Sequence, residues 1–81
     1  MKRFDVSLVG FGNVNRAFAR LVAEGNDGFA SEFGFRLNFV AVTDLYFGSV
    51  ISAAGIDART LAETGFEKGA LAKLPGGIAH A

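Results

Sequence analysis

The sequence lacks cysteine and has a single histidine, His80, among its 81 residues. Without cysteine it can form neither a disulfide framework nor a thiolate metal site. One imidazole cannot make a histidine-rich metal site by itself. We therefore predict no metal site and no catalytic metal.

Charge of one sign and long apolar runs are also missing. Eight basic residues balance eight acidic ones and are scattered, whereas a nucleic-acid-binding face needs clustered basic residues. No stretch approaches the ~20 apolar residues of a membrane span. Asp5 and the following glycines interrupt the N-terminal segment too early for a signal peptide. These absences predict a cytoplasmic protein that binds neither nucleic acid nor membrane.

Hydrophobic residues, by contrast, are plentiful. They make up 51% of the sequence and include nine phenylalanines, which is rich for a chain long enough for one small domain. A domain of this size buries only about 60% of its unfolded surface. The composition therefore indicates either a homo-oligomer or a segment whose apolar surface is covered by a missing remainder.

Periodicity predicts a strand, a helix and a second strand in the first half of the chain. Residues 4–10 and 35–43 are rich in β-branched and aromatic residues and become apolar on both faces, as in a buried parallel sheet. Residues 13–24 carry an apolar stripe at helical spacing, which places Arg16 and Arg20 toward water and ends at Gly25. The members of the stripe are Val14, Ala17, Phe18, Leu21 and Val22.

The other segments have weaker patterns. Residues 25–34 and 45–56 contain many turn-forming residues and are predicted loops. Asp57 can cap a short helix over about residues 57–64, and a second short helix is predicted over 66–73. The predicted class is therefore α/β, a partial Rossmann fold built on a βαβ unit with parallel strands and one or two short C-terminal helices.

The sharpest motif is the turn Gly10-Phe11-Gly12-Asn13-Val14-Asn15 between the first strand and the helix. Gly10 allows the chain to turn out of the strand, and Gly12 lets a pyrophosphate approach the backbone at the helix N-terminus. Asn15 stands where the fingerprint has its third glycine, so the helix either sits further from the sheet or uses the amide to contact a cofactor or a loop. The alternative is a tight turn that binds nothing.

Asp44 ends the second strand, where an acidic residue accepts hydrogen bonds from the adenosine ribose in this fold. It lies further from the glycines than the usual offset of about 20 residues, and the loop predicted over 25–34 accounts for the difference. The alternative is an aspartate in a solvated turn. No arginine beside Leu45 is available for a 2′-phosphate, so NAD is favoured over NADP as the cofactor.

These residues resemble the start of homoserine dehydrogenases. The similarity includes the glycine turn with Arg16-Ala17-Phe18, the strand ending at Asp44, and the segment from Gly48 to Gly65. The resemblance implies an oxidoreductase that interconverts homoserine and aspartate 4-semialdehyde with NAD or NADP, in threonine and methionine biosynthesis. By position it implies pyrophosphate contacts at Phe11, Gly12, Asn13 and Val14, and ribose contacts near Thr43, Asp44 and Leu45.

The resemblance also implies an incomplete enzyme, because the catalytic residues of that family lie far downstream. We predict no catalytic residue here and an N-terminal segment that is inactive alone. Two alternatives remain open: a non-catalytic nucleotide-binding or regulatory module that self-associates, and another Rossmann dehydrogenase or methyl-donor-binding protein with a similar first turn.

Overall fold

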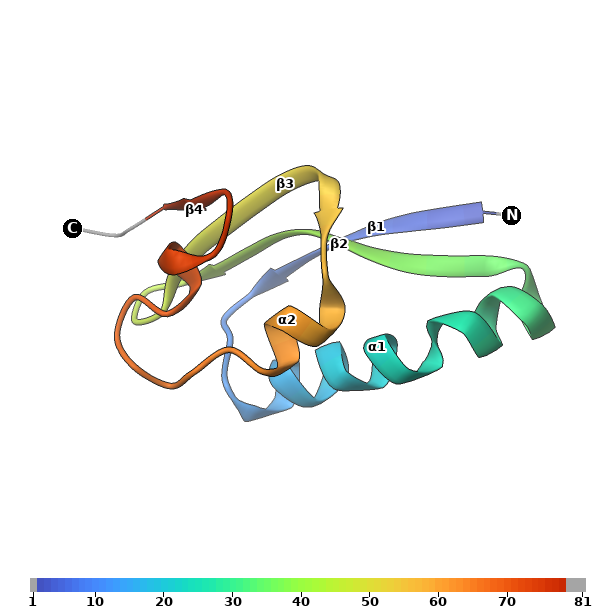
Figure 1. Cartoon of the computed structure of the whole chain (residues 1–81), viewed down its shortest axis with the longest axis horizontal. Helices are drawn as coiled ribbons and strands as arrows, with labels where there is room; N and C mark the ends of the chain where they lie inside the picture. The colour runs from blue at the N-terminus through green and yellow to red at the C-terminus, as the bar shows by residue number, and fades with distance from the viewer. Residues whose placement is uncertain (1, 79–81) are drawn as a thin grey trace.

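One four-stranded sheet forms a layer, and helices cover one side of it (Figure 1). The computed structural model describes residues 2–78, so His80 lies outside the described part of the chain. The elements in order are β1 (Lys2–Val9), α1 (Asn13–Phe33), β2 (Phe35–Asp44), β3 (Gly48–Ile56), α2 (Ala58–Ala62), the 3-10 turn η1 (Leu71–Lys73) and β4 (Gly77–Ile78). Helix α1 runs along the sheet and α2 packs against it.

The predicted βαβ unit is confirmed. The expectation that both faces of the first strand are buried is wrong, because Phe4 and Val9 are 50% and 87% exposed. Strands β1 and β2 are parallel, and their register runs from Lys2 opposite Phe35 to Val9 opposite Thr43. The register shifts between Val6 and Ser7, opposite a β-bulge in β2. The bulge resets the alternation, so that Phe39 and Val42 are both buried, three residues apart. Strict alternation along residues 35–43 would instead place Ala41 on the face of Phe39.

Helix α1 is longer than predicted, because it continues through Gly25 and Gly28 to Phe33. The prediction of a loop over residues 25–34 is therefore wrong. Packing outweighs the helix-breaking tendency of the glycines, since Phe29 and Phe33 stack on Phe35 with ring centroids 5.6 and 6.2 Å apart. The helix ends at Gly34, whose left-handed backbone lets its N–H donate to Ala30.

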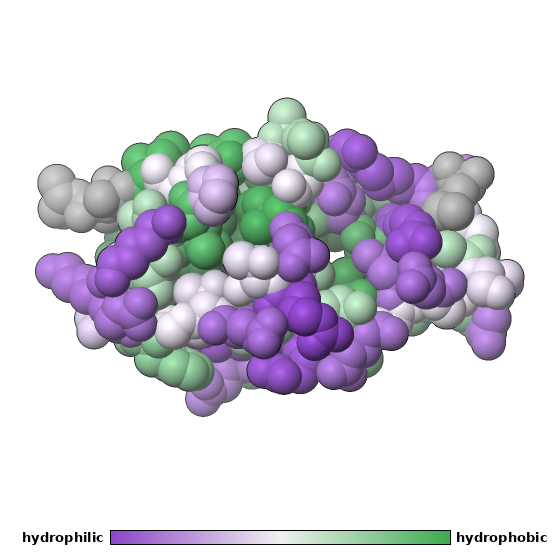
Figure 2. All heavy atoms as spheres, in the orientation of Figure 1, coloured by the Kyte–Doolittle hydropathy of each residue, from purple (hydrophilic) through white to green (hydrophobic). Residues whose placement is uncertain are grey.

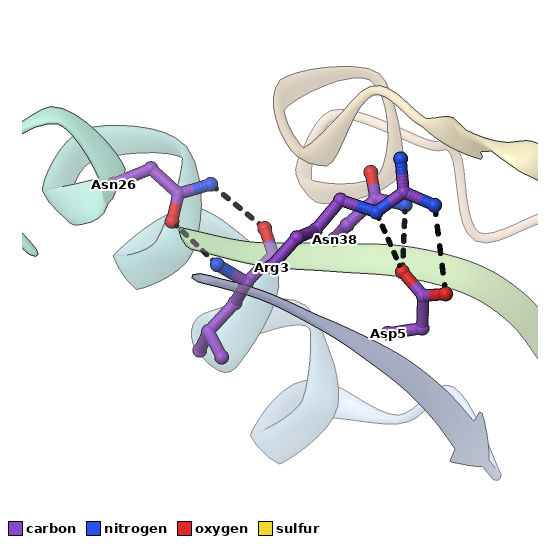
Figure 3. Close-up of polar contacts among 5 residues, drawn as sticks. Arg3, Asp5, Asn26 and Asn38 are labelled. Carbon is purple, nitrogen blue, oxygen red and sulfur yellow. Dashed lines mark hydrogen bonds and ion pairs between the residues drawn. The ribbon is translucent and has the colours of Figure 1, made fainter. Parts of the chain in front are cut away.

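Asn26 shows why this part of α1 is held against the sheet. Its side-chain amide donates to the carbonyl oxygen of Leu37 at 2.8 Å and accepts from the Leu37 N–H at 2.9 Å (Figure 3). Asn26 thus satisfies both backbone groups of one residue of β2. In the same view, Arg3 and Asn38 converge on the Asp5 carboxylate, and both hydrogen bonds keep the pKa of Asp5 below its ordinary value.

The buried face of α1 is rotated from the predicted stripe. Arg16, Ala19 and Val22 are buried, whereas Val14, Ala17 and Leu21 are exposed. The prediction that Arg16 faces water is wrong, and the one for Arg20 is confirmed. Figure 2 shows hydrophilic residues concentrated along the lower middle of one face, where α1 and α2 run, and hydrophobic residues above and to the left of them.

Strand β3 occupies most of the predicted loop over residues 45–56. It pairs antiparallel with β2, from Asp44 opposite Gly48 to Ala41 opposite Ile51 and, after a register shift, at Phe39 opposite Ile56. Strand β4 pairs with the start of β3. The glycines and alanines of β3 are poor strand formers, whereas Val50, Ile51 and Ile56 favour strands. Its strand conformation comes from the ladder with β2 and from the burial of Val50.

The C-terminal region contains one of the two predicted short helices. Asp57 caps α2 as predicted, because its carboxylate accepts from the backbone N–H and the hydroxyl of Thr60 at 3.0 and 2.8 Å. The prediction of a helix over residues 66–73 is wrong, because only η1 forms there. The N–H groups of Gly69 and Leu71 donate to Tyr46 and Phe47 instead of to helical acceptors.

Candidate functional site

The turn between β1 and α1 places the first amides of the helix at the end of the parallel strands. Gly10 has a φ of +84°, a conformation that favours glycine, and its N–H donates to the carbonyl of Thr43 at 2.6 Å. Gly12 is the N-cap of α1 and makes no side-chain cap. The first intrahelical hydrogen bond joins the Arg16 N–H to Gly12 at 3.0 Å. The N–H groups before Arg16 have no intrahelical acceptor, which creates a local positive potential.

The backbone conformation does not require a glycine at position 12. Its φ is −84°, which any residue adopts. A Cβ built on Gly12 would meet no atom within 4 Å. Neither backbone strain nor packing therefore explains a glycine here, whereas a group that approaches the backbone from outside would. The hydrogen-bond donors and the open space fit an anionic phosphate.

Phe11 anchors the turn through both its side chain and its backbone. The ring is fully buried and packs edge-on against Phe47, with ring centroids 6.4 Å apart. The backbone N–H donates to the Asp44 carboxylate at 2.7 Å. Because this N–H already has an acceptor, a pyrophosphate contact at Phe11 stays a prediction.

Asp44 connects the glycine turn to the hairpin that follows β2. One carboxylate oxygen accepts from Phe11, and the other accepts from Tyr46 and Phe47 at 2.8 and 3.0 Å. Burial raises the pKa of Asp44, but the three N–H donors and the charge of Arg16 outweigh it and hold this pKa below the ordinary value. Asp44 is therefore an ionised crosslink between two turns, which differs from the free turn aspartate of the alternative interpretation.

Asn15 uses its side chain to hold the turn. The amide nitrogen donates to the carbonyl of Gly10 at 2.7 Å and lies 3.5 Å from the carbonyl oxygen of Val9. The departure from the glycine fingerprint thus places a hydrogen bond between the helix and the end of the strand. Of the alternatives considered for Asn15, contact with the neighbouring loop is the one that the structure contains.

The other predicted site residues lie around the same edge. Asn13 and Thr43 are exposed at the start of α1 and the end of β2. Val14 and Leu45 are 83% and 89% exposed. The structure therefore brings all nine predicted residues to one edge of the sheet, where ligands bind in open α/β folds.

Sequence reasoning missed Arg16. Its side chain is only 6% exposed and donates to the carbonyl oxygens of Thr64 and Gly65. Its guanidinium lies over the face of the Phe11 ring. The only signal in the sequence was that Arg16 follows the glycine motif by one helical turn, and helical periodicity alone assigned it to the solvent side.

Other features of the described residues lie elsewhere or are missing. A hollow of about 470 Å³ is lined by residues that include Asn26, Arg36 and Arg59. None of the nine predicted site residues lines it. Within residues 2–78, no group of three or more His, Cys, Asp or Glu residues is arranged to hold a metal ion. None of the described helices is long and apolar enough to span a membrane.

The chain is similar over its whole length to a known dehydrogenase. All 81 residues align at 51% identity with an NAD(+)-dependent homoserine dehydrogenase of Pseudomonas canavaninivorans. The chain resembles the N-terminal part of a homoserine dehydrogenase. The resemblance predicted from the sequence is thus confirmed. The chain spans 23% of that homoserine dehydrogenase, less than a quarter of its length. No protein-family model and no solved structure matches the chain.

Proposed function

We propose that this chain binds the pyrophosphate of NAD at the N-terminus of α1, as the nucleotide-binding segment of an oxidoreductase of the homoserine dehydrogenase type. The observation that carries the proposal is Gly12. This glycine faces open space at a helix N-terminus, with neither a left-handed backbone nor a close neighbour to require it. A bound pyrophosphate explains the missing side chain, because it must approach the backbone closely.

The amides at the start of α1 are the proposed phosphate donors. They are the N–H groups of Gly12, Asn13, Val14 and Asn15, which precede the first intrahelical hydrogen bond. Asp44 accepts from three protein donors. Since a carboxylate offers about four lone-pair sites, Asp44 can accept one more hydrogen bond, from a ribose hydroxyl.

NAD is the proposed cofactor rather than NADP. The homologous dehydrogenase is NAD(+)-dependent. The ionised Asp44 repels a 2′-phosphate, and Leu45 beside it offers no positive charge. We therefore expect the affinity for NAD to exceed the affinity for NADP.

The proposed reaction context is the interconversion of homoserine and aspartate 4-semialdehyde, in the cytoplasm, on the route to threonine and methionine. We propose that the chain binds the cofactor without turning over substrate. Its partner would be the remainder of such an enzyme or a second copy. Support for an additional partner comes from β1, which pairs only with β2 within the described residues and leaves its other edge open.

Calorimetric titration of the full chain with NAD, NADP and S-adenosylmethionine tests this function. We expect heat with NAD, weaker binding of NADP and none with the methyl donor. Homoserine with NAD should give no NADH absorbance. Absence of binding to all three compounds would refute the proposal for this chain, and NADH formation would refute its inactivity.

The substitution Gly12→Ala locates the site. A Cβ at this position meets open space in the protein, so the fold should survive with a loss of about 1 kcal/mol or less from the weaker N-cap. The methyl group would occupy the path of the pyrophosphate, and we expect at least a tenfold loss of NAD affinity. Gly28→Ala is the matched control, because its Cβ also meets no atom within 4 Å. Unchanged affinity in Gly12→Ala would place the nucleotide elsewhere.

A second candidate function is a self-associating module without catalysis. It is favoured by the apolar residues on the outer side of α1, where Val14 and Leu21 are both exposed. Sedimentation of the chain with and without NAD distinguishes the two candidates. A monomer at all concentrations would exclude self-association.

A further inference from the structure

Arg16 is a buried cation that the nucleotide-binding proposal does not use. One guanidinium nitrogen donates to the carbonyl of Thr64, and another donates to Gly65 at 2.8 Å. The Nε atom is buried without a hydrogen-bond partner within the described residues. Burying a charge costs free energy unless the charge is paired and fully hydrogen-bonded. The arrangement therefore calls for an explanation other than stability.

Three aromatic rings surround the guanidinium. Its central carbon lies 4.5 Å from the ring centroid of Phe11, 4.7 Å from that of Phe47 and 4.0 Å from that of Phe66. Each distance is within the range of a cation–π interaction. The rings come from the glycine turn, the hairpin after β2 and the segment after α2. Arg16 is thus the common contact of three segments that are far apart in sequence.

Two of these three aromatic residues are also the partners of Asp44. The backbone N–H groups of Phe11 and Phe47 donate to its carboxylate, while their rings contact Arg16. The two residues are therefore held by an anion through their amides and by a cation through their rings. Glu67 is a second anion that interacts with the Arg16 charge.

We propose that Arg16 is a positioning residue of the nucleotide site: it fastens the segment Thr64–Phe66 to the glycine turn and thereby fixes the backbone of Phe11 and Gly12. This inference rests on the proposed NAD binding for its functional consequence. Its structural part, the fixing of the turn, can be measured without nucleotide. A failure of the positioning role of Arg16 is therefore distinguishable from a failure of NAD binding.

The test compares the full-length chain with Arg16→Lys and Arg16→Met. Lysine keeps the charge but lacks the planar fork that reaches two carbonyls and stacks on rings. Methionine keeps an apolar stem of similar length without charge. Arg20→Met is the matched control, because Arg20 lies one turn further along α1 and is exposed. Three quantities are measured by nuclear magnetic resonance and calorimetry: amide exchange at Phe11, the pKa of Asp44 and the affinity for NAD.

In both Arg16 variants we expect amide exchange at Phe11 to accelerate at least tenfold and NAD affinity to fall at least tenfold. The pKa of Asp44 should rise in Arg16→Met and stay low in Arg16→Lys, because the Arg16 charge is one cause of its depression. Arg20→Met should change none of the three. A loss of thermal stability with unchanged exchange, titration and affinity would overturn the proposal, since Arg16 would then serve packing alone.

Two further outcomes are informative. If the wild-type chain binds no NAD, exchange at Phe11 still decides whether Arg16 fixes the turn. If neither Arg16 variant folds, Phe66→Leu takes their place, because it removes the ring nearest the guanidinium from a residue that is 64% exposed. We expect Phe66→Leu to accelerate exchange at Phe11 about threefold, and an unchanged rate would overturn the proposal.

Discussion

Replacing Asp44 with asparagine should remove the crosslink between the glycine turn and the hairpin. The Phe11 N–H donates to one carboxylate oxygen, and the Tyr46 and Phe47 N–H groups donate to the other. Asparagine has one oxygen and one NH2 group, so its donor must face either Phe11 or the hairpin amides. At least one hydrogen bond to a charged group is lost, which costs about 1.5–3 kcal/mol. The remaining bonds lose their charge, so we expect a decrease in unfolding free energy of about 2–3 kcal/mol.

Urea denaturation and thermal melting monitored by circular dichroism measure this change. For a domain of this size, each kcal/mol shifts Tm by about 4–8 °C, so Tm should fall by roughly 10 °C or more. Asp57→Asn is the matched control, because asparagine caps a helix as well as aspartate. Equal stability of the Asp44 and Asp57 variants would refute the reasoning, since it would mean that the crosslink contributes nothing.

The same crosslink predicts acid sensitivity. The pKa of Asp44 is lower in the folded chain than its ordinary value near 3.9. Its stabilisation is therefore fully present above about pH 4–5 and is lost as the pH falls through the folded-state pKa. The Tm of the wild-type chain should decrease between about pH 5 and pH 2. In Asp44→Asn the decrease in Tm should be smaller. A pH profile identical to that of the wild-type chain would show that the Asp44 carboxylate does not cause the acid sensitivity.

Three other substitutions test the fold. Asn26→Leu should lower the unfolding free energy by about 2–4 kcal/mol and accelerate amide exchange at Leu37, because both backbone groups of Leu37 lose their partner. Unchanged exchange at Leu37 would contradict this role of Asn26. Gly55→Ala should destabilise by about 1–3 kcal/mol, because its φ is +117° and its Cβ would clash with the side-chain oxygen of Asn38. Gly28→Ala should instead raise the unfolding free energy by up to about 1 kcal/mol. Equal changes in unfolding free energy for the two alanine variants would argue against backbone strain from a side chain at position 55.

The sequence predicted the glycine turn and the parallel strands because both depend on local chemistry. Gly10 adopts a positive φ, and the apolar runs before Gly10 and Asp44 indicate strands. Asp57 as a helix cap is equally local, since its carboxylate bonds three residues ahead. Each of these features lies within a few residues of its cause. The resemblance to homoserine dehydrogenases was found from the same motifs.

Only tertiary structure decided the rest, because its causes are far away in sequence. Helix α1 passes two glycines since Phe35 and Leu37 of the next strand hold its C-terminal half. Strand β3 is extended because β2 offers it a ladder. Arg16 is buried because three rings from separate segments surround it, which no helical periodicity can reveal. The sequence by itself thus determined the glycine turn at the start of α1, and long-range contacts decided how that turn is held.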